Sequence, residues 1–241
     1  MARIICATWL VLLATSAPAQ TPQPEWIADS RTGCRVWNAF PVSGETINWS
    51  GTCQNGLAQG RGVAEWLRDG KPDSRYEGEY RDGKANGWGV LASMNGNRYE
   101  GEFRDDNPNG RGVFTYASGN RYEGGVMDGK RHGRGVYTFA SGDRHAGEFR
   151  DGRANGQGVY TYASGDRYEG DLRDGKANGR GVFTFANGSR YAGDFRDDKA
   201  HGVGSFVRGD ETFSGTWSNG CFRQGNRTAV FGRTAKECGF E

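Results

Sequence analysis

Apolar and polar residues alternate along short stretches of this chain, and the stretches come in pairs. In residues 98–104, aromatic residues and a glycine alternate with charged residues, which is the two-residue period of a β-strand. In residues 113–116, Val and Thr alternate with Phe and Tyr in the same way. Between such stretches lies a segment that commonly reads D-G-K-A-N-G, rich in residues that favour tight turns. Each pair of stretches therefore predicts a β-hairpin.

The hairpin pattern recurs with a period of 23 residues. Because a single hairpin cannot bury its own aromatic side chains, neighbouring copies must pack against one another. The predicted fold class is all-β: an elongated, single-layer antiparallel sheet of stacked β-hairpins. About seven copies occupy residues 48–220, beginning at Asn48 (divergent), Arg75, Arg98, Arg121, Arg144, Arg167 and Arg190 (one residue short), with a half copy from Phe213.

The two faces of this sheet differ in chemistry. One face carries a stripe of Tyr and Phe, and the other carries Arg and Glu together with Val and Thr. A glycine stands at the middle of each first strand, where we expect it to leave room for a neighbouring aromatic ring. A single-layer sheet has no second layer to cover the aromatic stripe, so part of the stripe should stay accessible.

The N-terminal residues do not follow the repeat. An apolar run over residues 4–13 follows Arg3 and precedes the sequence Ala17-Pro18-Ala19. This pattern is typical of a secretory signal peptide, here residues 1–19, with cleavage after Ala19. The run is too short to span a bilayer, which takes roughly 20 apolar residues. We therefore expect an exported protein, periplasmic or extracellular.

Removal of the expected signal peptide, which contains Cys6, leaves four cysteines in two pairs near the ends of the array, and an even number in an exported chain indicates disulfides. They lie as two local pairs, Cys34 with Cys53 and Cys221 with Cys238, so we expect each pair to close a cap at one end of the sheet. The caps would comprise residues 20–47 and 221–241. A metal site is the competing interpretation, but the spacings are not C-x-x-C and no histidine lies nearby.

Composition limits the kinds of partner. Glycine accounts for 41 residues and aliphatic residues are few, yet aromatic residues reach 12%, which argues against a disordered chain. Basic and acidic residues number 31 and 29, for a net charge of +2. Near-neutral charge gives no support to a nucleic-acid partner recruited by bulk electrostatics.

Catalytic motifs are lacking in the sequence. It contains no G-x-S-x-G elbow, Walker loop or H-E-x-x-H motif. His132, His145 and His201 occupy regular positions of the repeat, and the Asp-Gly turns match neither of the common calcium-binding spacings. We therefore expect no enzymatic activity, no cofactor and no metal, with an enzyme of unrecognised type as the remaining alternative.

The motif Y-x-G-x-x-x-x-G-K-x-x-G-x-G, as in residues 168–181, resembles the MORN repeat. Single copies depart from it: Asp106 and Asp198 replace the turn glycine, His145 replaces the leading tyrosine, and Val126 and Leu172 replace the strand aromatic residue. The resemblance implies an elongated, twisted all-β rod used for protein association, dimerisation or contact with phospholipid head groups.

The leading hypothesis is a non-catalytic scaffold or binding module of the cell envelope, which binds a protein partner or associates with itself. Binding would use an end of the rod or its aromatic face, for which the candidate residues are Tyr99, Phe103, Phe114, Tyr116, Tyr122, Tyr137, Phe139, Phe149, Tyr160, Tyr162 and Tyr168.

The alternative is binding to phospholipid head groups or to a membrane surface through basic residues in the turns. An aspartate accompanies most of these cations, so simple solubility of the turns also explains them. The candidate cations are Lys84, Lys130, Arg153, Lys176 and Lys199.

Overall fold

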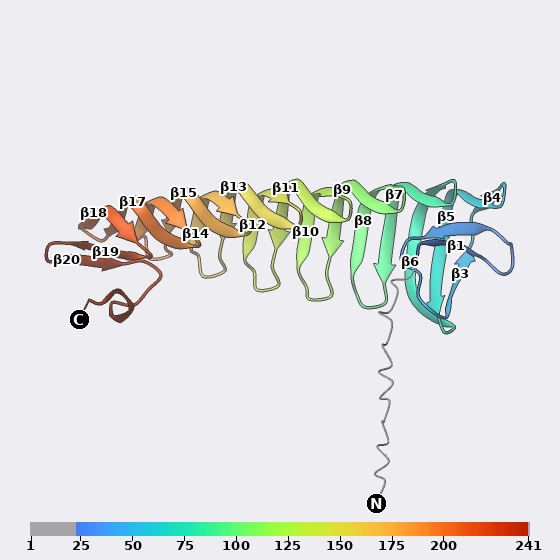
Figure 1. Ribbon diagram of the computed structural model, residues 1–241, viewed down its shortest axis with the longest axis horizontal. Helices are drawn as coiled ribbons and strands as arrows, with labels where there is room; N and C mark the ends of the chain where they lie inside the picture. Colours follow the sequence, from blue (N-terminus) through green and yellow to red (C-terminus); the bar gives the residue numbers. More distant parts are fainter. Residues whose placement is uncertain (1–22, 241) are drawn as a thin grey trace, which may run out of the picture.

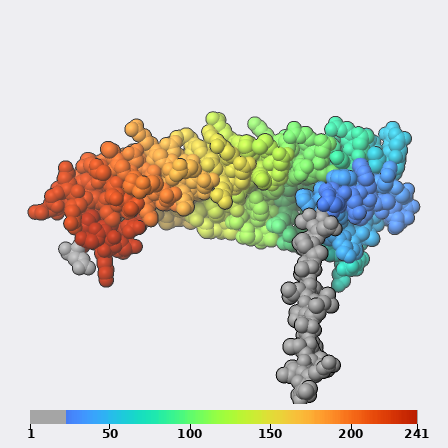
Figure 2. Space-filling view, in the orientation of Figure 1, coloured from blue at the N-terminus to red at the C-terminus, as the bar shows by residue number. Residues whose placement is uncertain are grey.

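The computed structural model describes residues 23–240, which form one long, open and mostly antiparallel sheet. Consecutive hairpins follow one another along a rod, with the N-terminal strands at one end and the C-terminal strands at the other (Figure 1; Figure 2). The predicted all-β fold class is confirmed, whereas the expected signal peptide lies outside the described residues. The array consists of β5 (Leu57–Arg68), β6 (Lys71–Arg81), β7 (Lys84–Ser93), β8 (Arg98–Arg104), β9 (Asn107–Thr115), β10 (Arg121–Met127), β11 (Lys130–Thr138), β12 (Arg144–Arg150), β13 (Arg153–Thr161), β14 (Arg167–Arg173), β15 (Lys176–Thr184), β16 (Arg190–Arg196), β17 (Lys199–Arg208) and β18 (Glu211–Ser218).

The turn within each repeat is shorter than the sequence predicts. Only two residues reverse the chain, for example Asp105 and Asp106 with φ angles of 47° and 70°. Two consecutive residues in the left-handed region match the twist of a hairpin, so the strands can pair again immediately. The Lys-Ala-Asn-Gly stretch interpreted as turn is therefore strand, and β9 begins at Asn107 rather than at 113.

A β-bulge bends each hairpin. Between β8 and β9 the register shifts after the Gly101–Gly112 pair. Gly110 has a φ angle of 106°, and the backbone N–H of Arg111 donates to Oε1 of Glu102 at 3.0 Å. A bulge of this kind bends a strand and increases its twist. We call the part of each hairpin between the bulge and the tight turn its arm. The bulge curls this arm toward the aromatic face, so that Arg131, near the turn, lies against an aromatic ring of that face.

The core is a single layer of aromatic rings that lie over paired glycines. In β10, the Tyr122 ring covers Gly135 of the next strand so closely that a Cβ atom there would lie 2.4 Å from the tyrosine oxygen. The Tyr122 hydroxyl donates to the carbonyl of Gly125 at 2.7 Å, and Phe149 of the next copy packs with its ring centroid 5.0 Å away. The glycines therefore make room for the rings, as expected from the sequence, and the rings join neighbouring repeats.

An N-terminal cap precedes the array. The backbone N–H of Trp49 donates to the buried carboxylate of Asp29 at 2.7 Å, and the side chain of Arg31 lies 3.0 Å from the same carboxylate. The hydrogen bond from Arg31 holds the pKa of Asp29 well below its usual range. A disulfide joins Cys34 to Cys53. The cap contains β1 (Glu25–Ala28), β2 (Arg35–Asn38), β3 (Glu45–Trp49) and β4 (Thr52–Gln54).

A C-terminal cap follows the array. It contains β19 (Cys221–Gln224), β20 (Arg227–Val230) and the 3-10 turn η1 (Lys236–Cys238), and a disulfide joins Cys221 to Cys238. Both predicted disulfide pairings are thus confirmed. In the described part of the chain, η1 is the longest helical segment, and none could cross a bilayer.

Candidate binding face

The aromatic face divides into a buried row and a half-exposed row. Tyrosine and phenylalanine side chains on the first strand of each hairpin lie beneath the curled arms and form the core. Five of the predicted binding residues belong to this row, and because each is at most 5% exposed they cannot form much of a contact surface: Tyr99, Phe103, Tyr122, Phe149 and Tyr168.

Rings on the second strand of each hairpin remain accessible. Phe114, Tyr116, Tyr137, Phe139 and Tyr160 are half-buried, and Tyr162 is 36% exposed. Two residues of the same row, Phe183 and Phe185, are absent from the sequence prediction although their positions in the repeat indicate them.

The tyrosine hydroxyls of the two rows differ in their hydrogen bonds. In the buried row, Tyr99 donates to the carbonyl of Glu102 at 3.0 Å, and Tyr168 donates to that of Asp171 at 2.7 Å. In the half-exposed row, the hydroxyls of Tyr116 and Tyr160 make no hydrogen bond to another described residue, and burial is the largest cause that raises their pKa. This row therefore presents free hydrogen-bonding groups next to apolar rings.

The half-exposed rings form one wall of a groove, and the tight turns of the curled arms form the other. Arg131, at the turn end of β11, reaches across so that its guanidinium lies 4.6 Å from the centroid of the Tyr137 ring. We call this channel the aromatic groove. The rings that line its central hollows are Tyr137, Phe139, Tyr160, Tyr162 and Phe183, and the same half-exposed row continues to Phe114 and Tyr116 on one side and to Phe185 on the other.

Successive hollows deepen the aromatic groove. A hollow of ≈ 470 Å³ near the N-terminal cap is lined by Leu91 and Phe103 among others. Another, of ≈ 260 Å³, lies two repeats further along between Tyr137 and Tyr160, and a third, of ≈ 230 Å³, lies between Tyr160 and Phe183. The last two hollows are one repeat apart and share Tyr160 as a common wall.

The C-terminal cap fills the groove at the end of the array. Phe231 follows β20 and places its ring 5.4 Å from Phe183, 5.1 Å from Tyr191 and 5.7 Å from Phe195, measured between centroids. Because Phe231 lies outside the repeats, no periodic signal in the sequence indicates this contact. The groove is therefore closed by this chain's own residues at its C-terminal end and open over the central repeats.

Charges in the groove differ between the two central hollows. Arg131 and Arg153 line the hollow between Tyr137 and Tyr160, where Arg153 lies 3.8 Å from Asp174. In the next hollow, Asp198 is the charged residue of the lining. One hollow thus carries a surplus of positive charge, and its neighbour carries a carboxylate.

The predicted turn cations do not converge on one site. Each stands at the first position of the strand that follows a tight turn, so they are spaced along the rod one repeat or more apart. Lys84 lies with its ammonium 5.2 Å from the centroid of the Trp37 ring, and Arg153 is paired with Asp174. Lys130 and Lys176 are exposed, and Lys199 is half-buried.

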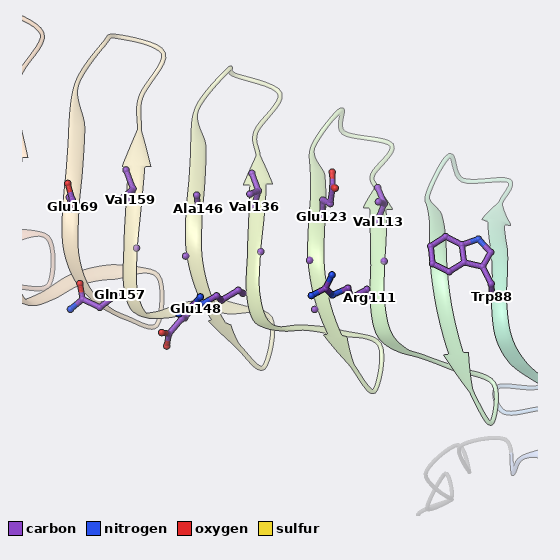
Figure 3. Close-up of a pocket in the computed structure, with 17 residues that line it drawn as sticks. Trp88, Arg111, Val113, Glu123, Val136, Ala146, Glu148, Gln157, Val159 and Glu169 are labelled. Atoms are coloured by element: carbon purple, nitrogen blue, oxygen red, sulfur yellow. The ribbon is translucent and has the colours of Figure 1, made fainter.

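The opposite face carries a broad, shallow trough. Figure 3 shows Val113, Val136 and Val159 in one row beside the bare backbone of the paired glycines, with Arg111 and Glu148 nearer the bend. The trough has a volume of ≈ 750 Å³. Exposed ion pairs such as Arg121 with Glu123 at 2.7 Å line this face, and pairs of this kind contribute little to stability.

Comparisons with known proteins identify the family to which the repeats belong. No curated protein is similar enough in sequence to match the chain. Among solved structures, the TCP domain of SAS-4 (dCPAP) of Drosophila melanogaster, in complex with a proline-rich motif of Ana2 (dSTIL), is 15% identical with a TM-score of 0.37, covering 62% of this chain and 86% of that domain chain. The MORN repeat matches residues 76–98, 99–121, 122–144, 145–167, 168–190 and 191–212. These six consecutive matches cover more than half of the sequence, so the chain belongs to the MORN repeat family.

Proposed function

We propose that this protein is a non-catalytic binding module of the cell envelope and that it associates with another protein, or with a second copy of itself, through the aromatic groove. MORN repeats are modules that bind proteins or membranes. Signal-directed export through residues 1–19, two end caps and an intervening array over residues 48–220 are part of this proposal. The two disulfides support an oxidising compartment.

The observation that carries the proposal is the half-exposed row of rings. A sheet with one layer leaves these rings open to solvent along the central repeats, where neither cap covers them. Tyrosine is enriched at protein interfaces because its ring supplies apolar contact and its hydroxyl a hydrogen bond. The row around Tyr137 and Tyr160 offers both.

Membrane binding through the turns is the less supported alternative. Head-group binding needs cations that are free and close together, whereas Lys84 stacks on an aromatic ring and Arg153 pairs with a carboxylate. Sedimentation with vesicles that contain anionic lipid, at low and at high salt, measures this activity directly, because head-group contact weakens with ionic strength.

Charged substitutions in the groove test the proposal. We expect Tyr137→Glu and Tyr160→Glu each to lower partner capture from native envelope extract, or self-association of the purified protein, by at least about tenfold, because each removes an apolar ring and introduces a carboxylate that must lose water on binding, at a cost of more than about 1.4 kcal/mol.

Glu100→Lys is the matched control, because Glu100 lies on the opposite face and is exposed enough to tolerate the change. Association should persist in this variant. The proposal would be contradicted if folded Glu100→Lys protein lost association as strongly as the two Tyr→Glu variants. Salt-sensitive binding to vesicles without any protein association would contradict it as well.

A further inference from the structure

The spacing of the hollows in the aromatic groove points to a particular partner conformation. Each repeat contributes two strands, so equivalent hollows recur about every 9.6 Å along the rod at the usual separation of strands. The hollow between Tyr137 and Tyr160 and the hollow between Tyr160 and Phe183 are one such step apart. A segment that lies along the groove must therefore present equivalent side chains at this interval.

The regular conformations of a peptide differ in how well they meet this interval. A polyproline II helix has three residues per turn and returns to the same face about every 9.3 Å. A β-strand returns about every 6.8 Å, and an α-helix presents positions seven residues apart at about 10.5 Å. At each step the polyproline II helix differs from the repeat by about 0.3 Å, the α-helix by about 0.9 Å and the β-strand by about 2.8 Å, so the polyproline II helix matches best.

We propose that the aromatic groove binds a proline-rich segment of a partner protein in the polyproline II conformation, one turn per repeat. This inference rests on the proposed function, because it specifies the partner of the same groove. The aromatic side chains of the groove suit this ligand, because the pyrrolidine rings of proline pack against aromatic rings. The carbonyl groups of a polyproline II segment make no hydrogen bonds within the segment, so the tyrosine hydroxyls can donate hydrogen bonds to them.

The C-terminal cap already shows how a chain outside the array uses the groove. Phe231 follows the last strand, and its ring inserts among Phe183, Phe185 and Tyr191. The backbone N–H of Phe231 donates to the carbonyl of Gly220 at 2.8 Å, and the residues after Phe231 are neither strand nor α-helix, so over the groove the contact is made by an inserted ring rather than by an added strand. The hollow between Tyr137 and Tyr160 offers similar ring surfaces with no residue of the cap in its lining, whereas Phe231 also forms part of the wall of the hollow between Tyr160 and Phe183.

The charges of the groove indicate where the ligand should be charged. Arg131 favours an acidic residue at the hollow between Tyr137 and Tyr160, where Arg153 is already paired with Asp174, and Asp198 favours a basic residue at the next hollow. One repeat corresponds to three residues of the ligand. The complementary segment therefore carries opposite charges three residues apart, with prolines between them.

A designed peptide tests the inference on the purified full chain. The probe is a fluorescein-labelled peptide of the sequence Pro-Pro-Glu-Pro-Pro-Lys written twice, and its partner probe has Gly-Ser in place of each Pro-Pro. We expect saturable binding of the proline probe in fluorescence anisotropy and at least about tenfold weaker binding of the Gly-Ser probe, which must lose more conformational freedom on binding.

Single variants then locate the site. Tyr160→Phe keeps the ring and removes the hydroxyl, and we expect about 2- to 10-fold weaker binding from the lost hydrogen bond. Tyr160→Ala should weaken binding further. Val159→Ala, one residue away and on the opposite face, should leave the affinity unchanged, and thermal unfolding of each variant confirms that it is folded.

Three results would overturn the inference: no binding of the proline probe, equal binding of the two probes, or equal loss in the Val159→Ala and Tyr160→Ala variants. Tighter binding of an amphipathic helical peptide of equal length would overturn it as well. If such a result came while Tyr137→Glu still abolished protein association, the groove would remain the binding site and only the ligand conformation would be wrong.

Discussion

His145 occupies the position at which the other complete copies of the repeat carry a tyrosine. The side chain is 1% exposed, and its ring stacks on Tyr160 with a centroid distance of 4.3 Å. Burial lowers its pKa from 6.5 to about 4. The imidazole is therefore neutral in the folded protein at neutral pH, and it lacks the hydroxyl that bonds to the bulge carbonyl in the other copies.

We expect His145 to make the central repeats sensitive to acid. Between pH 6.5 and 4 the unfolded chain binds a proton at this residue and the folded chain does not, so the free energy of unfolding falls as the pH falls, by up to about 3 kcal/mol. The double substitution His145→Tyr with Leu172→Val should remove this component. Urea unfolding of both proteins at pH 7 and at pH 4.5 measures the difference.

The chain itself supplies the template for this variant, because Tyr99 with Val126 is the equivalent pair of the second complete copy. Carboxylates titrate alike in the two proteins, so the difference between them isolates the imidazole. An identical loss of stability on acidification in the two proteins would show that His145 does not carry a shifted pKa.

Sequence alternation places Tyr99 and Phe114 on the same face but cannot rank their exposure. Both residues satisfy the period of a strand, and both were candidates for binding. Burial is decided by the bulge after Gly101, which curls the turn arm over the first-strand residues only. No periodicity in the sequence reports this bend, and that is why half of the predicted face proves to be core.

At the scale of the strand pair, the paired glycines are the positions at which the fold tolerates substitution least. Gly135 lies under the Tyr122 ring, and an added Cβ atom would meet the ring at 2.4 to 2.6 Å. The ring is 0% exposed and its hydroxyl is bonded to the backbone, so it has little freedom to move.

We expect Gly135→Ala to destabilise the protein by about 1–3 kcal/mol through overpacking. Urea unfolding gives the value, and hydrogen exchange should locate the loss in β10 to β12. In the Tyr122→Ala background the same change should cost much less, because the space above Gly135 is then vacant. An equal cost in both backgrounds would mean that the glycine is required for its backbone conformation and not for the ring.

Local sequence predicts the position of each turn but not its length. Asp-Gly and Asp-Asp pairs identify the reversal correctly, because φ is positive at both residues, as at Asp82 with 51° and Gly83 with 74°. Asn and Gly later in the segment suggest a longer turn. There the glycine, such as Gly110, serves a bulge inside a strand, a use that the residue types alone do not distinguish.

At the scale of the whole molecule, the repeats leave an open groove and the caps limit its length. The N-terminal cap places Trp49 4.7 Å from Tyr80 between ring centroids, and the C-terminal cap places Phe231 over the last rings. The period of the sequence predicts the rod, and the positions of the cysteines predict the caps. The way in which Phe231 enters the groove depends on a segment without periodicity and could not be predicted.

The central claim is that partners bind the aromatic groove rather than the opposite face. Val159 and Tyr160 are adjacent in β13, and their side chains project to opposite faces of the sheet. A photoreactive phenylalanine analogue at each position, in cells that produce the full chain, compares the two faces within one repeat. We predict a covalent adduct with a partner, or with a second copy, from position 160 and at least about tenfold less from position 159. Equal yields, or a higher yield from position 159, would contradict the account.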